Sequence, residues 1–220
     1  MIKGIIFDLD GTLLDSMPAW EHLGEEYLRE IGVEPEENLN EILADMSTRQ
    51  GAEYVVRHYR LSLTVDQVID GINDRIHDFY FYQAPMKPGI MEFIQYFQEK
   101  EIPMTIATAS AREIVEAALK RLQIDGFFQK VLTCPDMKTN KTEPDIYIAA
   151  AENMQTVLAE TWVFEDSLFA LETAKHAGFP TVGVYDLSSA SQWKKIQETA
   201  DYSMENIADA EKFFKTASRS

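Results

Sequence analysis

Cysteine and basic residues are scarce in this chain of 220 residues. Its single cysteine, Cys134, excludes an intramolecular disulfide, which fits a reducing compartment. A nucleophilic cysteine needs a base beside it, and Cys134 precedes Pro135 with no histidine nearby, so we expect no catalytic role for it. Twenty lysines and arginines stand against 37 aspartates and glutamates, giving a formal net charge of −17. So acidic a surface repels nucleic acid and anionic lipid, and we expect neither as a partner.

Long hydrophobic runs are absent as well. The apolar stretch at 2–9 is short and interrupted by acidic residues, so it is neither a signal peptide nor a membrane span. We therefore expect a cytoplasmic protein, with a monomer as the default state. Hydrophobic residues make up 45% and charged residues 26%, proportions typical of a globular protein with a packed core.

Apolar runs of strand length alternate with amphipathic helical patterns over most of the chain. The runs lie at 2–9, 102–108, 161–165 and 181–184, with a further candidate at 128–132. The helical patterns lie at 90–100, 112–123, 145–154 and 168–177. This alternation predicts an α/β fold, a doubly wound, Rossmann-like parallel sheet with right-handed crossovers.

Residues 16–83 break this alternation. They contain amphipathic patterns at 20–31, 39–44, 51–59 and 65–82 and no convincing strand. Pro85 and the pair Pro88-Gly89 mark a plausible re-entry into the α/β region. We therefore predict a helical cap domain, 16–83, inserted into a core domain formed by 1–15 and 84–220.

Two carboxylates stand at the end of the first predicted strand. Asp8 and Asp10 are two residues apart and can share a face of the chain, and Gly11 permits a sharp turn just beyond them. The carboxyl edge of a parallel sheet is where α/β folds bind ligands. Two carboxylates there can hold a hard cation and divide the roles of nucleophile and acid.

Residues 8–12, Asp-Leu-Asp-Gly-Thr, resemble the first motif of the haloacid dehalogenase superfamily. Within it, the chain is most similar to the subgroup of β-phosphoglucomutase and phosphoglycolate phosphatase, which has a helical cap after this motif. The sequence Ile106-Ala107-Thr108-Ala109-Ser110 looks like the second motif. The resemblance implies that the Thr108 hydroxyl and backbone N–H groups from Ala109 onward bind a phosphoryl group. A threonine that ends a strand can also simply cap a helix.

The third and fourth motifs have counterparts further along the chain. Lys141, three residues before Pro144-Asp145, is similar to the lysine of the third motif, although family members often have proline where this chain has Thr142. Glu165-Asp166 follows the predicted strand 161–165 and resembles the fourth motif. Asp166 could also simply cap the next helix.

The resemblance implies a Mg²⁺-dependent phosphatase, a phosphoric monoester hydrolase acting on a small phosphorylated metabolite such as a sugar phosphate. Asp8 would attack phosphorus to form an aspartyl-phosphate, and Asp10 would serve as general acid and then as general base. Lys141 and Thr108 would stabilise the transferring group. Mg²⁺ would be held by Asp8, the Asp10 carbonyl and Asp166, with Glu165 as a direct ligand or through water.

The inserted helices should act as a cap that excludes water and selects the substrate. Family caps carry selectivity residues after the first motif and in a substrate loop, which here match Trp20 and Arg49, with Arg112 as a further candidate. Trp20 could equally be a core residue of the cap. Arg49 could pair with a distal anionic group of the substrate or be an ordinary exposed arginine.

Two other functions stay open. A β-phosphoglucomutase-type phosphomutase carries a histidine where this chain has Trp20, and Ser-Lys-Asn where it has Ser110-Ala111-Arg112, so we favour hydrolysis. A phospho-accepting signalling receiver also uses clustered aspartates, a threonine and a lysine in an α/β fold. Such a receiver is shorter and has no role for the insert.

Overall fold

The computed structural model describes residues 2–43, 46 and 48–218. The chain divides into two compact units, the first comprising Met1–Met17 and Ala84–Ser220 and the second Pro18–Gln83. We call them the core unit and the insert and describe each by itself.

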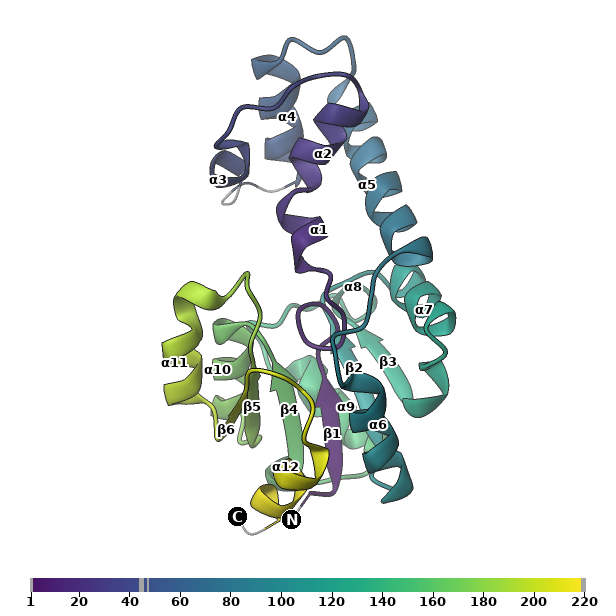
Figure 1. Cartoon of the computed structure of the whole chain (residues 1–220), viewed down its shortest axis with the longest axis vertical. Coiled ribbons are helices and arrows are strands. Elements are labelled where there is room, and N and C mark those ends of the chain that lie inside the picture. The colour runs from purple at the N-terminus through teal and green to yellow at the C-terminus, as the bar shows by residue number, and fades with distance from the viewer. Residues whose placement is uncertain (1, 44–45, 47, 219–220) are drawn as a thin grey trace. The chain divides into compact units, whose positions relative to one another are not determined.

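The core unit is built on a six-stranded, all-parallel sheet (Figure 1). Its strands are β1 (Gly4–Phe7), β2 (Met104–Thr108), β3 (Lys130–Thr133), β4 (Thr161–Glu165), β5 (Thr181–Val184) and β6 (Tyr202–Met204). They lie in the order β3-β2-β1-β4-β5-β6, so the direction of winding reverses between β1 and β4. Ligands of open α/β sheets bind at the carboxyl ends of the strands beside such a reversal.

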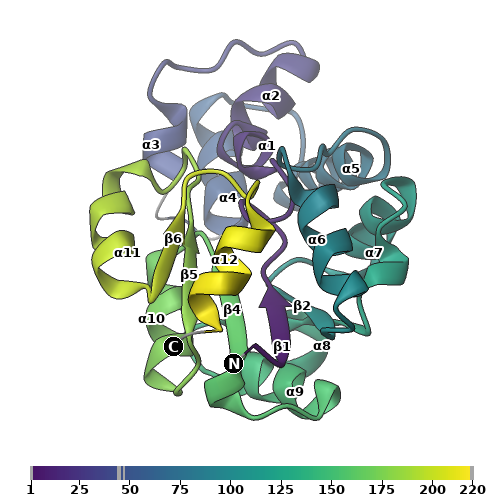
Figure 2. The ribbon, with the colours of Figure 1, turned by 60° about the horizontal axis from the view of Figure 1, so that its bottom comes forward.

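Helices cover both faces of the sheet. They are α6 (Ile90–Glu99), α7 (Arg112–Arg121), α8 (Cys134–Met137), α9 (Asp145–Met154), α10 (Leu168–His176), α11 (Trp193–Thr199) and α12 (Ala210–Ala217). On one face Ile6 and Val163 pack against α9 residues such as Tyr147. On the other, Phe7 and Phe164 meet aromatic rings of α6 and α12, which lie side by side in Figure 2. Because neighbouring residues of a strand point to opposite faces, the apolar runs fill both halves of the core.

The described part of the insert contains helices joined by loops and no strand. Its helices are α2 (Leu23–Glu30), α3 (Leu39–Leu43), α4 (Thr48–His58) and α5 (Val65–Tyr82), preceded by α1 (Met17–Glu21), which begins in the core unit. Two small apolar clusters hold them together, one around Tyr27 and Val68 and one around Leu28 and Val55. None of the helices among the described residues is long and apolar enough to cross a membrane.

The α/β class, the parallel sheet and the helical insertion after β1 agree with the sequence prediction. The predicted helix 20–31 is wrong in one respect, because the chain breaks at His22 and forms two helices, α1 and α2. The predicted helix 39–44 ends at a residue outside the described part of the chain. β6, α11 and α12, which complete the carboxyl-terminal side of the core, were not predicted from the sequence.

Candidate active site

Four motif residues gather at the carboxyl edge of the sheet. Asp8 directly follows β1, and its backbone N–H donates to the Phe164 carbonyl of β4 at 3.0 Å. Since Phe7 is in register with Phe164, Asp8 stands level with Glu165, the last residue of β4. Asp166 comes next, so three carboxylates lie on either side of the point where the winding reverses.

Lys141 joins this cluster from the loop before α9. Its Nζ donates to Asp8 Oδ1, and to Glu165 Oε1 at 2.7 Å. Lys141, Asp8 and Glu165 are all buried, with 6%, 6% and 1% of their surface exposed. A buried charge is tolerated when it is paired and hydrogen-bonded, and this lysine satisfies both conditions.

Burial and crowding shift the acid–base equilibria of this cluster. Burial raises the pKa of Asp8 well above its usual range; Lys141 opposes the shift and the neighbouring carboxylates add to it. Burial, with help from Glu165, also raises the pKa of Asp166 to about 7. Burial alone would lower the pKa of Lys141, but Asp8 and Glu165 raise it above its ordinary value. Lys141 is therefore charged at neutral pH, and its single positive charge does not offset the raised pKa values of Asp8 and Asp166.

The cluster fits a divalent cation. Asp8, Glu165 and Asp166 each offer a carboxylate oxygen, and these three atoms lie within 4.8 Å of one another. Carboxylate oxygens are the ligands that hard cations such as Mg²⁺ prefer. Lys141 supplies one positive charge to three carboxylates, and a divalent cation would balance the remaining two.

Gly11 makes room for this arrangement. Its φ of +78° lies in the left-handed region, and a Cβ added to it would overlap the carboxylate of Asp166. A residue with a side chain would be strained there and would displace Asp166. The glycine after Asp10 is therefore required by backbone conformation and by the close approach of the fourth motif.

Asp10 is held by two hydroxyl groups. Ser16 Oγ donates to its Oδ1 and Ser110 Oγ to its Oδ2, each at 2.6 Å. Asp10 is half-buried and lies outside the cluster of three carboxylates that could share a cation. Its carboxylate is thus oriented between the loop after β1 and the end of β2.

The residues of the second motif occupy the neighbouring strand end. Thr108 is the last residue of β2 and is fully buried, and its Oγ1 accepts the Ser110 backbone N–H at 3.0 Å. The hydroxyl keeps a hydrogen that can be donated to a phosphoryl oxygen. Ala109 is exposed between them, just before α7.

Two residues that contact the motif carboxylates were not predicted from the sequence. Tyr147 donates its hydroxyl to Glu165 Oε1 at 2.7 Å, so this one oxygen accepts from both Tyr147 and Lys141. Ser16 is the other, through its bond to Asp10. A tyrosine two residues after Pro144-Asp145 could have been suspected, since it falls on the helix that follows the lysine, whereas no sequence pattern marks Ser16.

The candidate selectivity residues have partners near them. Trp20 is 37% exposed, and its Nε1 donates to the Tyr80 hydroxyl of α5 at 2.9 Å. Arg49 forms an exposed ion pair with Asp66 at 2.8 Å. In the core unit, Arg112 pairs with Asp136 at 2.6 Å, at the start of α7. Trp20 and Arg49 both belong to the insert, whereas Arg112 belongs to the core unit.

Comparison with known proteins identifies the family. The family model of haloacid dehalogenase-like hydrolases matches residues 5–184, which include all four motifs and the whole insert. The chain belongs to this family. Its predicted membership and hydrolase class are thereby confirmed.

Relatives and solved structures agree with this assignment. A phosphorylated carbohydrates phosphatase from Thermotoga maritima is 24% identical over 185 residues, covering 82% of this chain and 84% of that protein. A fructose-1-phosphate phosphatase from Escherichia coli is 25% identical over 181 residues, covering 82% of this chain and 95% of that protein. A solved Thermotoga maritima structure, assigned provisionally as a β-phosphoglucomutase, matches with a TM-score of 0.85 at 21% identity. It covers 98% of this chain and 99% of that chain. The likeness of the solved structure confirms the fold.

Proposed function

We propose that this family hydrolase is a Mg²⁺-dependent phosphatase that cleaves a small phosphorylated metabolite, such as a sugar phosphate, through an aspartyl-phosphate on Asp8. The observation that carries the proposal is the buried cluster in which Lys141 bonds Asp8 beside Glu165 and Asp166. The names of the two phosphatase relatives support the substrate class.

A phosphate ester is anionic, so its charge must be neutralised before a carboxylate can approach phosphorus. Lys141 places one ammonium group against the nucleophile, and Thr108 with the N–H of Ala109 offers hydrogen bonds to the phosphoryl oxygens. Mg²⁺ held by Asp8, Asp166, Glu165 and the Asp10 carbonyl would supply the further positive charge.

Asp8 then attacks phosphorus, and the bond from phosphorus to the ester oxygen breaks as the new bond to the carboxylate forms. Asp10, oriented by Ser16 and Ser110, donates a proton to the departing oxygen. In the second step Asp10 takes a proton from water, which attacks phosphorus and releases phosphate and free Asp8.

The insert is proposed as the cap that shields this reaction from bulk water, with Trp20 and Arg49 as candidate contacts to the leaving group. It contains no lysine, and its five arginines stand against nine glutamates and five aspartates. Arg29, Arg49, Arg57 and Arg75 each pair with a carboxylate of the insert. So acidic a cap disfavours a second anionic group and favours monophosphates with an uncharged leaving group.

A phosphomutase is the second candidate, supported by the likeness to the provisional β-phosphoglucomutase. A mutase must grip a second phosphate, and the acidic insert offers little for this. Hydrolysis is therefore the preferred proposal. The paired test is incubation with hexose phosphates and Mg²⁺, since inorganic phosphate marks a phosphatase and conversion between the 1- and 6-phosphates marks a mutase.

The experiment that tests the proposal is a phosphate-release screen over sugar phosphates, polyol phosphates and phosphoglycolate, with Mg²⁺ and with chelator. We expect turnover of uncharged sugar or polyol monophosphates only when Mg²⁺ is present. Release that is unaffected by chelator, or that is absent for the whole panel, would contradict the proposal.

A further inference from the structure

The segment by which the chain re-enters the core unit pairs with the loop after β1. Residues 85–87 run antiparallel to residues 13–15, forming what we call the entry ribbon. Its contacts are Asp15 N–H to the Pro85 carbonyl at 2.9 Å, Lys87 N–H to the Leu13 carbonyl at 2.9 Å, and a bridge between Leu14 and Met86. The position of the loop after β1 thus depends on residues 70 or more positions away in sequence.

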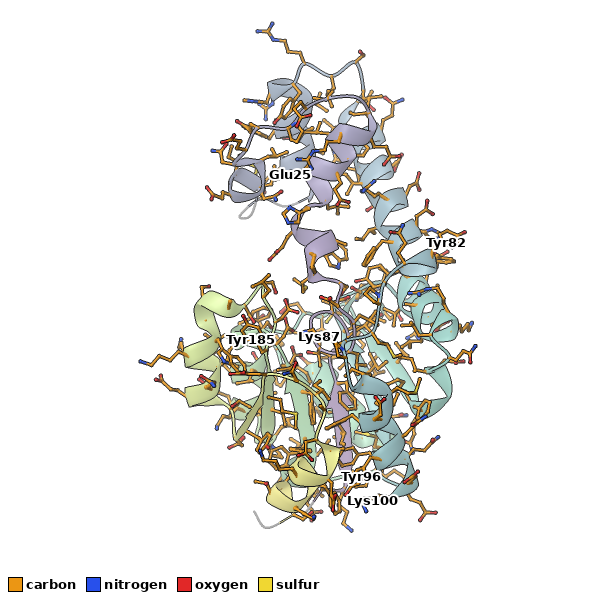
Figure 3. All side chains as sticks on the ribbon, in the orientation of Figure 1. Glu25, Tyr82, Lys87, Tyr96, Lys100 and Tyr185 are labelled. Carbon is orange, nitrogen blue, oxygen red and sulfur yellow. The ribbon has the colours of Figure 1, made fainter. Side chains whose placement is uncertain are left out.

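The Lys87 side chain ties the entry ribbon to the end of β5. Its Nζ donates to the Tyr185 carbonyl at 2.7 Å (Lys87 and Tyr185 are labelled in Figure 3). It also donates to Asp186 Oδ2 at 2.7 Å. Asp186 is 4% exposed, and its Oδ1 accepts from the backbone N–H of Ser188 at 3.0 Å and its hydroxyl at 2.6 Å. Asp186 is buried and the Lys87 side chain is 13% exposed, so the ion pair is largely shielded from water, unlike the exposed pairs that contribute little.

The residue that follows the entry ribbon contacts Asp10. Ser16, the residue after the ribbon, donates to Asp10 Oδ1 at 2.6 Å. The loop that carries Asp10 is closed by N–H groups of Leu13 and Leu14 that donate to the Leu9 carbonyl, each at 2.8 Å. A shift of the ribbon would consequently move Ser16 and the base of the Asp10 loop together.

We propose that Lys87 is a positioning residue for Asp10, which it acts on through the entry ribbon and Ser16. The ion pair with Asp186 fixes the ribbon against β5, and the fixed ribbon holds the Asp10 carboxylate where it can protonate the departing oxygen. This inference rests on the proposed function in one respect, the role of Asp10 as general acid.

Leaving groups of different basicity separate positioning from mere stability. An alkyl phosphate leaves as a strongly basic oxygen that needs the Asp10 proton, whereas p-nitrophenolate leaves without one. kcat/KM covers the steps up to cleavage of the ester, so later hydrolysis of the aspartyl-phosphate does not mask the difference. We expect Lys87→Met to lower kcat/KM for an alkyl phosphate about tenfold or more, with a much smaller loss for p-nitrophenyl phosphate.

Lys175 supplies a control at the other end of β5, in an ion pair whose side chains are 39% and 38% exposed. Its Nζ bonds Asp201 at 3.0 Å and the Thr199 carbonyl, so it likewise joins a carboxylate and a backbone carbonyl. Lys175→Met should leave the ratio of the two kcat/KM values at the wild-type level. Lys87→Arg, which retains the charge, should restore most of the alkyl phosphate activity.

Asp10→Asn, measured on the same two esters, separates the two proposals. Suppose that Asp10→Asn loses far more kcat/KM for the alkyl phosphate than for p-nitrophenyl phosphate, while Lys87→Met keeps the wild-type ratio of the two values. That result overturns the positioning role of Lys87 and leaves the proposed function standing. If Asp10→Asn loses kcat/KM equally for both esters, Asp10 is not the general acid, and the role of Lys87 fails with it. If Lys87→Met does not fold, Asp186→Asn is measured instead; a ratio shifted in the same direction supports the proposal, and a wild-type ratio refutes it.

Discussion

Replacing Lys141 with methionine should destabilise the protein in a way that depends on pH. Methionine fills a similar volume but leaves Asp8, Glu165 and Asp166 buried without the ammonium group. Removing one partner of a buried ion pair costs about 3–5 kcal/mol. We expect a loss of that size in the free energy of unfolding at pH 8, measured in urea with chelator present. Lys138→Met, an exposed lysine in the same loop, should change it by less than about 0.5 kcal/mol.

Protonation of the carboxylates sets the direction of the pH effect. The pKa values of Asp8 and Asp166 are raised in the folded protein, for Asp166 to about 7. The folded protein therefore binds protons at these two groups more tightly than the unfolded chain does. The resulting contribution to the free energy of unfolding is present at low pH and is lost as the pH rises through about 7. Lys141 lowers both pKa values, so the variant should hold these protons more tightly. The free energy of unfolding that Lys141→Met loses relative to the wild type should therefore be smaller at pH 5 than at pH 8. A loss that is the same at both pH values, or below about 1 kcal/mol at pH 8, would refute the account of the cluster.

Three further outcomes follow from the same site. Because burial raises the pKa of Asp166 to about 7, protons should compete with Mg²⁺ below that pH, and titration calorimetry should show weaker binding at pH 6 than at pH 8. Tyr147→Phe removes a hydrogen bond to Glu165, so apparent Mg²⁺ affinity should fall about 10–100-fold, with the exposed Tyr82→Phe as control; unchanged affinity would contradict this. A hexose bisphosphate should have a higher KM than the matching monophosphate, because the acidic insert repels its second phosphate. Since salt screens this repulsion, raising the salt concentration should reduce the difference between the two KM values.

The regular part of the fold was predictable because its signal is local. β4, β5, α5 and α9 have the bounds that their apolar runs and helical periods predict, since each is buried along a whole strand or stripe. β6 was not predicted because it is three residues long and only partly buried. The break at His22 was not predicted because the helical period continues across it.

The candidate site divides in the same way. Three of the four motifs could be placed at strand ends from sequence, and the sheet order brings Asp8 beside Glu165. Lys141 reaches both from the loop before α9. Ser110 and Asp10 are 100 residues apart, and Lys87 and the Tyr185 carbonyl are 98 apart. Contacts over such separations depend on loop paths, for which the sequence carries no periodic signal. The orienting partners of the site were therefore found only in the folded chain.

Covalent chemistry at Asp8 is the centre of the account, and it can be measured directly. The enzyme is mixed with Mg²⁺ and a substrate that it turns over, quenched in acid within milliseconds to seconds, and digested for mass spectrometry. We predict a phosphoryl group on the peptide that contains Asp8, absent from Asp8→Asn, which should also lose turnover. An unmodified Asp8 peptide at every quench time, together with near wild-type turnover by Asp8→Asn, would contradict the account.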